Sequence, residues 1–135
     1  MRIAVVGSSG MFGAEMLSLL ESRGIDTKGF KRGNLNFDQT AESLADSFKG
    51  FDAVINAVAF TAVDNAEAET YEANTVNGVY AGQLAQASKI AGARFIHIST
   101  DYVFEGTSKT PYKISDKIDP QTAYGKSKVL GEQLV

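Results

Sequence analysis

Tyr124 and Lys128 are the residues whose types and spacing point most directly to proton transfer. They stand four positions apart in a segment with a helical pattern, so they share one face of the predicted helix. A phenol with an ordinary pKa of about 10 is a weak acid–base catalyst at neutral pH. A neighbouring ammonium favours the phenolate and lowers that pKa. The pair predicts an acid–base site, and an exposed amphipathic pair is the structural alternative.

Thr100 lies at the end of a predicted strand, Arg94–Thr100. Open α/β sheets bind their ligands at the carboxyl ends of the strands. A hydroxyl there can hydrogen-bond a substrate carbonyl and hold it against Tyr124. The one histidine of the chain, His97, alternates with its neighbours on one face of this strand. We interpret His97 as a satisfied core or interface residue and not as a catalytic base.

A glycine-rich loop lies between the first predicted strand and the first predicted helix, with the spacing G-x-x-G-x-x-G. Such a loop turns tightly, lets the backbone approach a phosphate, and directs the helix N-terminus at it. A tight turn without a ligand is the alternative interpretation. The cofactor-binding residues predicted here are Gly7, Ser9, Gly10, Met11, Phe12 and Gly13.

The residues after the second predicted strand bear on the choice of dinucleotide. An acidic residue at this place would grip a ribose 2′-hydroxyl and favour NAD. The sequence instead has Lys31 and Arg32 after Phe30. A cation accommodates a 2′-phosphate, so we expect NADPH, with NADH as the alternative. Two solvated loop charges would be the structural explanation.

Strand and helix patterns alternate along the chain. This order predicts a parallel sheet with helices on both faces, a doubly wound Rossmann-type α/β fold. The last helix has no stop signal and such sheets normally continue, so we expect truncation before the last strands. The predicted strands are 2–6, 25–30, 52–58 and 94–100; the predicted helices are 11–23, 40–49, 70–91 and 123–135; a long ordered loop covers 101–120.

Composition excludes several classes of protein. The 135 residues suit one domain, 44% of them are hydrophobic, and the net charge is −3 without a basic block. We therefore expect no nucleic-acid partner, and no membrane partner because no apolar stretch reaches the length of a span. With no cysteine and one histidine, thiolate or His-rich metal sites are excluded. The N-terminus does not resemble a signal peptide, so a cytoplasmic location is expected.

Six motifs together resemble the extended short-chain dehydrogenase/reductases, and among them the dTDP-4-dehydrorhamnose reductase subgroup. They extend from one end of the chain to the other. The resemblance implies NAD(P)H-dependent reduction of the 4-keto group of a dTDP-linked 6-deoxysugar. The motifs are GSSGMFG (7–13), INAVAFTAVDNAE (55–67), NTVNG (74–78), STDYVFEG (99–106), TPY (110–112) and YGKSKVLGE (124–132).

The resemblance also implies roles for particular residues. Thr100, Tyr124 and Lys128 match the catalytic triad, with Tyr124 as proton donor and Lys128 on the nicotinamide ribose, and both Tyr124 and Lys128 are implied to bind the cofactor. Glu15 matches a carboxylate linked to Mg²⁺ at a dimer interface in some members, so a homodimer is implied too. Asn36 stands where the family usually has Asp, which weakens the adenine contact. The other implied residues are Ala57, Val58 and Ala59 along the cofactor crevice, Phe37 near the adenine, and Val63, Asp101 and Tyr102 at the nucleotide sugar.

Residues 1–135 are thus expected to form a dinucleotide-binding domain, and the family's C-terminal substrate domain is absent from this chain. Alone, the chain should bind cofactor weakly or not at all and turn over nothing. Two alternatives are a non-catalytic NADP-binding partner module and a related nucleotide-sugar epimerase. The remaining acidic and aromatic residues are predicted to be structural, namely Asp64, Glu67, Glu69 and Glu72 as a solvated helix start, and Tyr71, Tyr80 and Tyr112.

Overall fold

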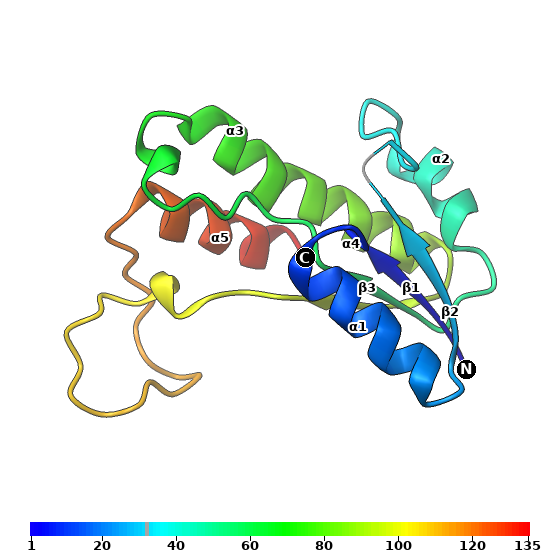
Figure 1. Cartoon of the computed structure of the whole chain (residues 1–135). Helices are drawn as coiled ribbons and strands as arrows, with labels where there is room; N and C mark the ends of the chain where they lie inside the picture. Colours follow the sequence, from blue (N-terminus) through cyan, green and yellow to red (C-terminus); the bar gives the residue numbers. More distant parts are fainter. Residues whose placement is uncertain (32) are drawn as a thin grey trace.

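A parallel four-stranded sheet forms the centre of the part of the chain that the computed structural model describes, residues 1–31 and 33–135 (Figure 1). The strand order is β2-β1-β3-β4, so the chain moves outward from β1 first in one direction and then in the other. This order confirms the doubly wound Rossmann-type prediction. The strands are β1 (Arg2–Val6), β2 (Asp26–Phe30), β3 (Ala53–Asn56) and β4 (Arg94–His97).

The helices follow the predicted order, with two differences in detail. The predicted helix 40–49 is an α-helix of five residues, α2, capped by Thr40 and followed by a 3₁₀ turn. The predicted helix 70–91 is interrupted by a π-helical turn, η3, which separates α3 from α4. The helices are α1 (Met11–Ser22), α2 (Ala41–Ala45), α3 (Thr70–Asn74), α4 (Tyr80–Ile90) and α5 (Ala123–Leu134); the shorter turns are η1 (Asp46–Phe48), η2 (Asn65–Glu67), η3 (Thr75–Val79) and η4 (Asp101–Val103).

Both faces are apolar at the centre of the sheet, which explains why β1 and β3 are nearly continuous hydrophobic runs, whereas the edge strands β2 and β4 alternate in exposure. On one face, Val5 and Ile55 lie in a cluster with Leu17 of α1. On the other face, the buried strand residues join a cluster with Leu44 of α2 and Leu84 of α4. No helix in the described part of the chain is both long and apolar enough to cross a membrane.

β4 forms one edge of the sheet. Ile96 pairs with Ile55 of β3 and therefore points to the face that α1 covers farther along the sheet. Ile96 is 46% exposed and Ile98, just beyond the strand, is 40% exposed. The cover over this face thus ends before the edge strand.

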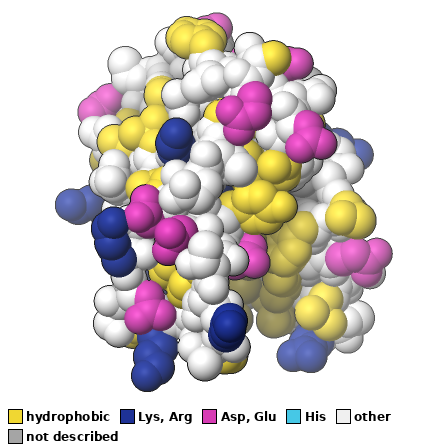
Figure 2. Space-filling model, turned by 90° about the vertical axis from the view of Figure 1, so that its left-hand side faces the viewer, with side chains coloured by type: hydrophobic (Ala, Val, Ile, Leu, Met, Phe, Trp, Pro, Cys, Tyr) yellow, Lys and Arg dark blue, Asp and Glu magenta, His cyan; other side chains and the backbone are white. Residues whose placement is uncertain are grey.

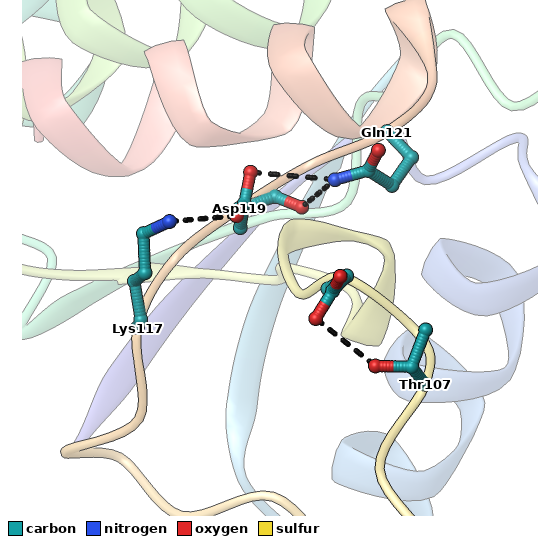
Figure 3. Close-up of polar contacts among 5 residues, drawn as sticks. Thr107, Lys117, Asp119 and Gln121 are labelled. Carbon is teal, nitrogen blue, oxygen red and sulfur yellow. Dashed lines mark hydrogen bonds and ion pairs between the residues drawn. The ribbon is translucent and has the colours of Figure 1, made fainter.

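The long loop between η4 and α5 is ordered by its own contacts, as predicted. The rings of Phe104 and Tyr112 stack with their centroids 4.3 Å apart, and the hydroxyl oxygen of Tyr112 accepts a hydrogen bond from the backbone N–H of Gly106 at 2.8 Å. Nearer to α5, Lys117 Nζ lies 2.8 Å from Asp119 Oδ2, and Gln121 Nε2 donates to the carbonyl oxygen of Asp119 (Figure 3). This ion pair raises the pKa of Lys117 and lowers the pKa of Asp119.

Candidate functional site

A cleft of about 550 Å³ opens at the carboxyl ends of β1 and β3. In a doubly wound sheet, ligands bind in this crevice, where the strand order reverses. Figure 2 shows the end of the molecule toward which the strands point, with hydrophobic side chains in a recess and acidic side chains near it. The predicted cofactor residues that line the cleft are Gly7, Ser9, Gly10, Lys31, Phe37, Ala57, Val58 and Ala59.

The glycine loop forms one wall of the cleft and presents free backbone donors. The N–H groups of Gly7 and Ser8 donate to the carbonyl oxygen of Phe30. Those of Ser9, Met11 and Phe12 have no acceptor among the described residues. These groups lie at the N-terminus of α1, where the helix dipole favours an anion. The loop is therefore suited to a phosphate, and Met11 and Phe12 would contribute their backbone because their side chains are exposed.

Gly7 is fixed by its conformation and by its neighbours. Its φ of +85° lies in the left-handed region, which residues with a Cβ adopt at a cost. A Cβ at this position would lie 2.9 Å from the backbone carbon of Ala57 and the backbone nitrogen of Val58. The absence of a side chain at Gly7 thus lets β1 and the segment after β3 come together beneath the cleft.

An aromatic pair lines another part of the cleft. The rings of Phe37 and Tyr80 stack at 4.0 Å with an interplanar angle of 16°, and Leu35 and Val76 line the cleft as well. Tyr80, which the sequence predicts to be structural, also lines the cleft. It begins α4 directly after the π-helical turn, and one additional residue in a turn rotates all following side chains about the helix axis.

Some predicted residues lie elsewhere. Asn36 does not line the cleft; its side-chain oxygen accepts the backbone N–H of Asp38 at 2.9 Å and so orders a turn. Gly13 is buried within α1 and packs against Gly7. Arg32 lies outside the described residues. In contrast, Glu72, predicted to be merely solvated, lines the cleft.

α5 carries Tyr124 and is anchored at its N-terminus by two side chains. Thr122 Oγ1 accepts the N–H of Gly125 at 3.0 Å, which is an N-cap. Glu67 Oε1 accepts the N–H of Ala123 at 2.8 Å. The prediction that Glu67 is only part of a solvated helix start is therefore wrong, because it caps a helix 56 positions away in the sequence.

Tyr124 is half-buried and meets a predicted substrate residue. Its ring lies 5.6 Å from the ring of Tyr102 at 80°, an edge-to-face contact. Tyr102 and Asp101 also line a smaller pocket of about 200 Å³. Thr100 caps η4, because its Oγ1 accepts the N–H of Tyr102 at 3.2 Å. The sheet edge thus brings the predicted catalytic and substrate residues of two distant segments together.

Lys128 is almost entirely buried, with 2% of its surface exposed. Its Nζ donates to the carbonyl oxygen of Ile98 at 2.5 Å and lies 3.4 Å from His97 Nε2. Burial lowers the pKa of Lys128, and the Glu132 carboxylate acts in the opposite direction. Tyr124 Oη makes no hydrogen bond to Lys128 within the described residues. The amino group is therefore held at the end of β4.

Two predicted site residues, Val63 and Glu15, do not lie with other predicted site residues in the described structure. Val63 is half-buried in the segment between β3 and η2. Glu15 is exposed on α1, and no group of three or more His, Asp or Glu side chains that could hold a metal occurs among the described residues. The Mg²⁺ prediction at Glu15 stays a prediction.

Asn77 in the π-helical turn joins the cleft segment to α5. It is fully buried, and its Oδ1 accepts the N–H of Phe60 at 2.8 Å while its Nδ2 donates to the carbonyl oxygen of the same residue at 3.1 Å. Nδ2 also donates to Ser127 Oγ at 2.8 Å, and Ser127 Oγ donates to the carbonyl oxygen of Tyr124. The segment after β3 and the helix with Tyr124 are thereby fixed to one amide.

We expect Asn77→Ala to lower the free energy of unfolding by about 2–4 kcal/mol, because the substitution removes the buried amide that pairs with the N–H and carbonyl groups of the half-buried Phe60. Urea unfolding followed by circular dichroism measures this loss. The matched control is Asn74→Ala, since Asn74 is half-buried and its side chain makes no hydrogen bond in the described structure. The control should change stability by less than about 0.5 kcal/mol. Equal losses in both variants would contradict the assigned role.

His97 makes stability depend on pH. Burial, followed by the nearby Lys128 charge, lowers its pKa to about 4. The unfolded chain takes up this proton at about pH 6.5, so the stabilisation is complete above that pH and is lost as the pH falls toward 4. We expect His97→Gln to remove about 1 kcal/mol of the stability loss between pH 7 and pH 5, after allowance for solvent screening. Urea midpoints at the two pH values test this, and parallel pH dependence in both proteins would contradict it.

The described structure is that of a Rossmann-type protein of the short-chain dehydrogenase/reductase class. It has a parallel doubly wound sheet, a glycine loop at the switch point of the sheet, and beside it the helix α5 with Tyr124 and Lys128. The sequence comparison assigns it more narrowly. The chain belongs to the RmlD substrate binding domain family, which it matches over residues 1–135.

Individual relatives agree with this assignment. The chain is 41% identical to a dTDP-4-dehydrorhamnose reductase of Burkholderia thailandensis, over 100% of the chain and 45% of the relative. It is 40% identical to the spore coat polysaccharide biosynthesis protein SpsK of Bacillus subtilis, over 99% of the chain and 48% of the relative. The chain thus spans about half the length of the curated relatives it matches.

Solved structures of related reductases share the fold. A dTDP-4-dehydrorhamnose reductase of Clostridium acetobutylicum superposes with a TM-score of 0.91 at 34% identity, covering 100% of this chain and 49% of that one. The enzyme of Bacillus anthracis in complex with NADP gives a TM-score of 0.90 at 31% identity, over 99% and 48% of the two chains.

Proposed function

We propose that this chain is the dinucleotide-binding part of an NADPH-dependent reductase that acts on the 4-keto group of a dTDP-linked 6-deoxysugar. The observation that carries the proposal is the cleft at the switch point, with three backbone donors at the N-terminus of α1 that have no acceptor in the described part of the chain. The names of the reductase relatives supply the substrate class. The polysaccharide-related name of SpsK is consistent with a nucleotide-sugar substrate.

The residues of the cleft fit a dinucleotide. The donors of Ser9, Met11 and Phe12 suit a pyrophosphate, and the stacked Phe37 and Tyr80 offer an aromatic wall for a base. Lys31 lines the cleft and can meet a 2′-phosphate, which favours NADPH over NADH. The NADP complex of the Bacillus anthracis relative supports this choice.

In the proposed reaction, NADPH supplies the hydride. Tyr124 donates a proton from Oη to the keto oxygen of the sugar as that oxygen gains charge. Thr100 holds the keto oxygen by a hydrogen bond, and Asp101, Tyr102 and Val63 face the sugar. Lys128, fixed at the end of β4, binds the ribose next to the nicotinamide with its remaining N–H groups.

The test is turnover by a chimera in which this chain replaces the N-terminal 45% of the Burkholderia thailandensis relative. We expect NADPH oxidation that depends on dTDP-4-dehydro-6-deoxy-L-mannose. Cofactor binding without consumption would contradict the reductase and favour a non-catalytic NADP-binding module. Epimerisation of the sugar without net NADPH oxidation would favour a nucleotide-sugar epimerase.

A further inference from the structure

Asn56, the last residue of β3, has its side-chain orientation fixed by the backbone. It is 1% exposed, and its Oδ1 accepts the N–H of Val58 at 3.0 Å. The opposite orientation would place an NH₂ group against that N–H, donor against donor. The Nδ2 group of Asn56 therefore faces His97 Nδ1, at 3.1 Å.

This orientation determines the tautomer of His97. Because Asn56 Nδ2 can only donate, Nδ1 of the imidazole must accept, and it carries no proton. The proton of the neutral ring then lies on Nε2. Nε2 is the atom that lies 3.4 Å from Lys128 Nζ.

An Nε2–H group cannot accept a hydrogen bond from Lys128. Within the described residues, Nζ has one acceptor, the carbonyl oxygen of Ile98 at 2.5 Å. An ammonium has three protons, so two of them have no acceptor in this part of the chain. The other tautomer would present a lone pair to Nζ and engage a second proton.

We propose that Asn56 and His97 are positioning residues for Lys128, and that they present an imidazole N–H to its amino group so that two ammonium protons stay available for a ligand. Neither residue touches the reacting atoms. Under the proposed function, on which this last step rests, the ligand is the ribose of NADPH.

The surroundings of the pair agree with this arrangement. The charged group that faces His97 is Lys128, and the one that acts on Lys128 is Glu132, which accepts a hydrogen bond from Ser99 Oγ. β3 contributes only the neutral Asn56 to this contact. An N–H dipole against an ammonium disfavours the charged form, in the same direction as burial, which lowers the pKa of both His97 and Lys128.

The first experiment is a two-bond ¹H–¹⁵N correlation spectrum of the chain labelled with ¹⁵N-histidine. The sequence has one histidine, so a single imidazole is observed. We expect the neutral Nε2–H tautomer at pH 7. An Nδ1–H tautomer or an imidazolium at this pH would overturn the proposal. Because the spectrum is recorded on the unsubstituted chain, the result does not depend on the folding of a variant.

Two variants test the two contacts separately, one between Asn56 and His97 and the other between His97 and Lys128. Asn56→Asp replaces the donor with an acceptor, so the proton should move to Nδ1, whereas the exposed control Asn65→Asp should leave the spectrum unchanged. His97→Gln adds no charge and offers a carbonyl oxygen to Lys128. It should raise the pKa of Lys128 by about one unit in a ¹³C-lysine titration, with the signal assigned through Lys128→Met. An unshifted tautomer or an unchanged Lys128 titration would overturn the proposal.

The same samples separate this inference from the proposed function. NADPH is titrated into the chimera and into its Asn56→Asp and Asn65→Asp forms. Weaker binding in Asn56→Asp alone supports the link to the ribose. Equal binding in all three forms overturns that link, and failure of the parent chimera to bind NADPH refutes the proposed function while the spectrum still decides the tautomer.

Discussion

Tyr124→Phe is expected to lower NADPH oxidation by the chimera about 100- to 10,000-fold, the range of an acid–base group in a transition state. The substitution removes the hydroxyl and keeps the ring. The ring packs against Tyr102 and joins a cluster with Phe60 and Ala123, so the fold should persist. The measurement is the initial rate of absorbance loss at the NADPH band with dTDP-4-dehydro-6-deoxy-L-mannose.

The control for this variant is Tyr71→Phe, which removes a hydroxyl from a side chain that is 83% exposed on α3. It should retain full turnover. Affinity for NADPH should be unchanged in Tyr71→Phe, because the glycine loop and the aromatic wall are intact. Undiminished turnover in Tyr124→Phe would show that another group donates the proton.

Gly7→Ala is expected to lower the free energy of unfolding of the chain by about 3 kcal/mol and to abolish NADPH binding by the chimera. A Cβ forces a strained left-handed conformation at φ +85°. It also collides with the backbone of Ala57 and Val58, which cannot move without shifting β3. Urea unfolding measures the first effect, and fluorescence titration with NADPH measures the second.

Gly24→Ala separates conformational strain from collision. Gly24 has a similar φ of +71°, but a Cβ there would have no atom within 4 Å. Only strain remains, so we expect a loss of about 1 kcal/mol and normal NADPH binding. Equal losses at the two glycines would mean that contact with Ala57 and Val58 does not matter.

The sequence predicts the central strands β1 and β3 well, because strands buried on both faces give continuous apolar runs that end at glycine or at a polar residue. Arg2–Val6 is recovered with its bounds, and positive-φ glycines follow α1 and α4. The π-helical turn is not predicted, since the sequence 70–91 is compatible with an uninterrupted helix. Within this wider turn, the buried amide of Asn77 makes tertiary hydrogen bonds to Phe60 and Ser127, which no local pattern indicates.

The candidate site likewise contains residues that the sequence predicts and residues that only the structure reveals. The glycine loop and the strand ends can be predicted, because the topology of a parallel sheet places them at one edge. Tyr80 lines the cleft directly after η3, and Glu72 lines it from α3, ahead of that turn. Glu67 caps α5 across 56 positions, a contact that no local pattern indicates.

The exposed edge strand has a consequence for behaviour in solution. β4 presents the unpaired side of its backbone along the sheet edge, next to the exposed Ile96 and Ile98. Natural sheets protect such edges with charges, prolines or covering segments, because an open apolar edge is a template for intermolecular pairing. Arg94 places a charge at the start of the strand, and His97, whose pKa burial lowers to about 4, is neutral at pH 7. Aggregation of this chain should therefore begin at β4 and increase steeply with protein concentration.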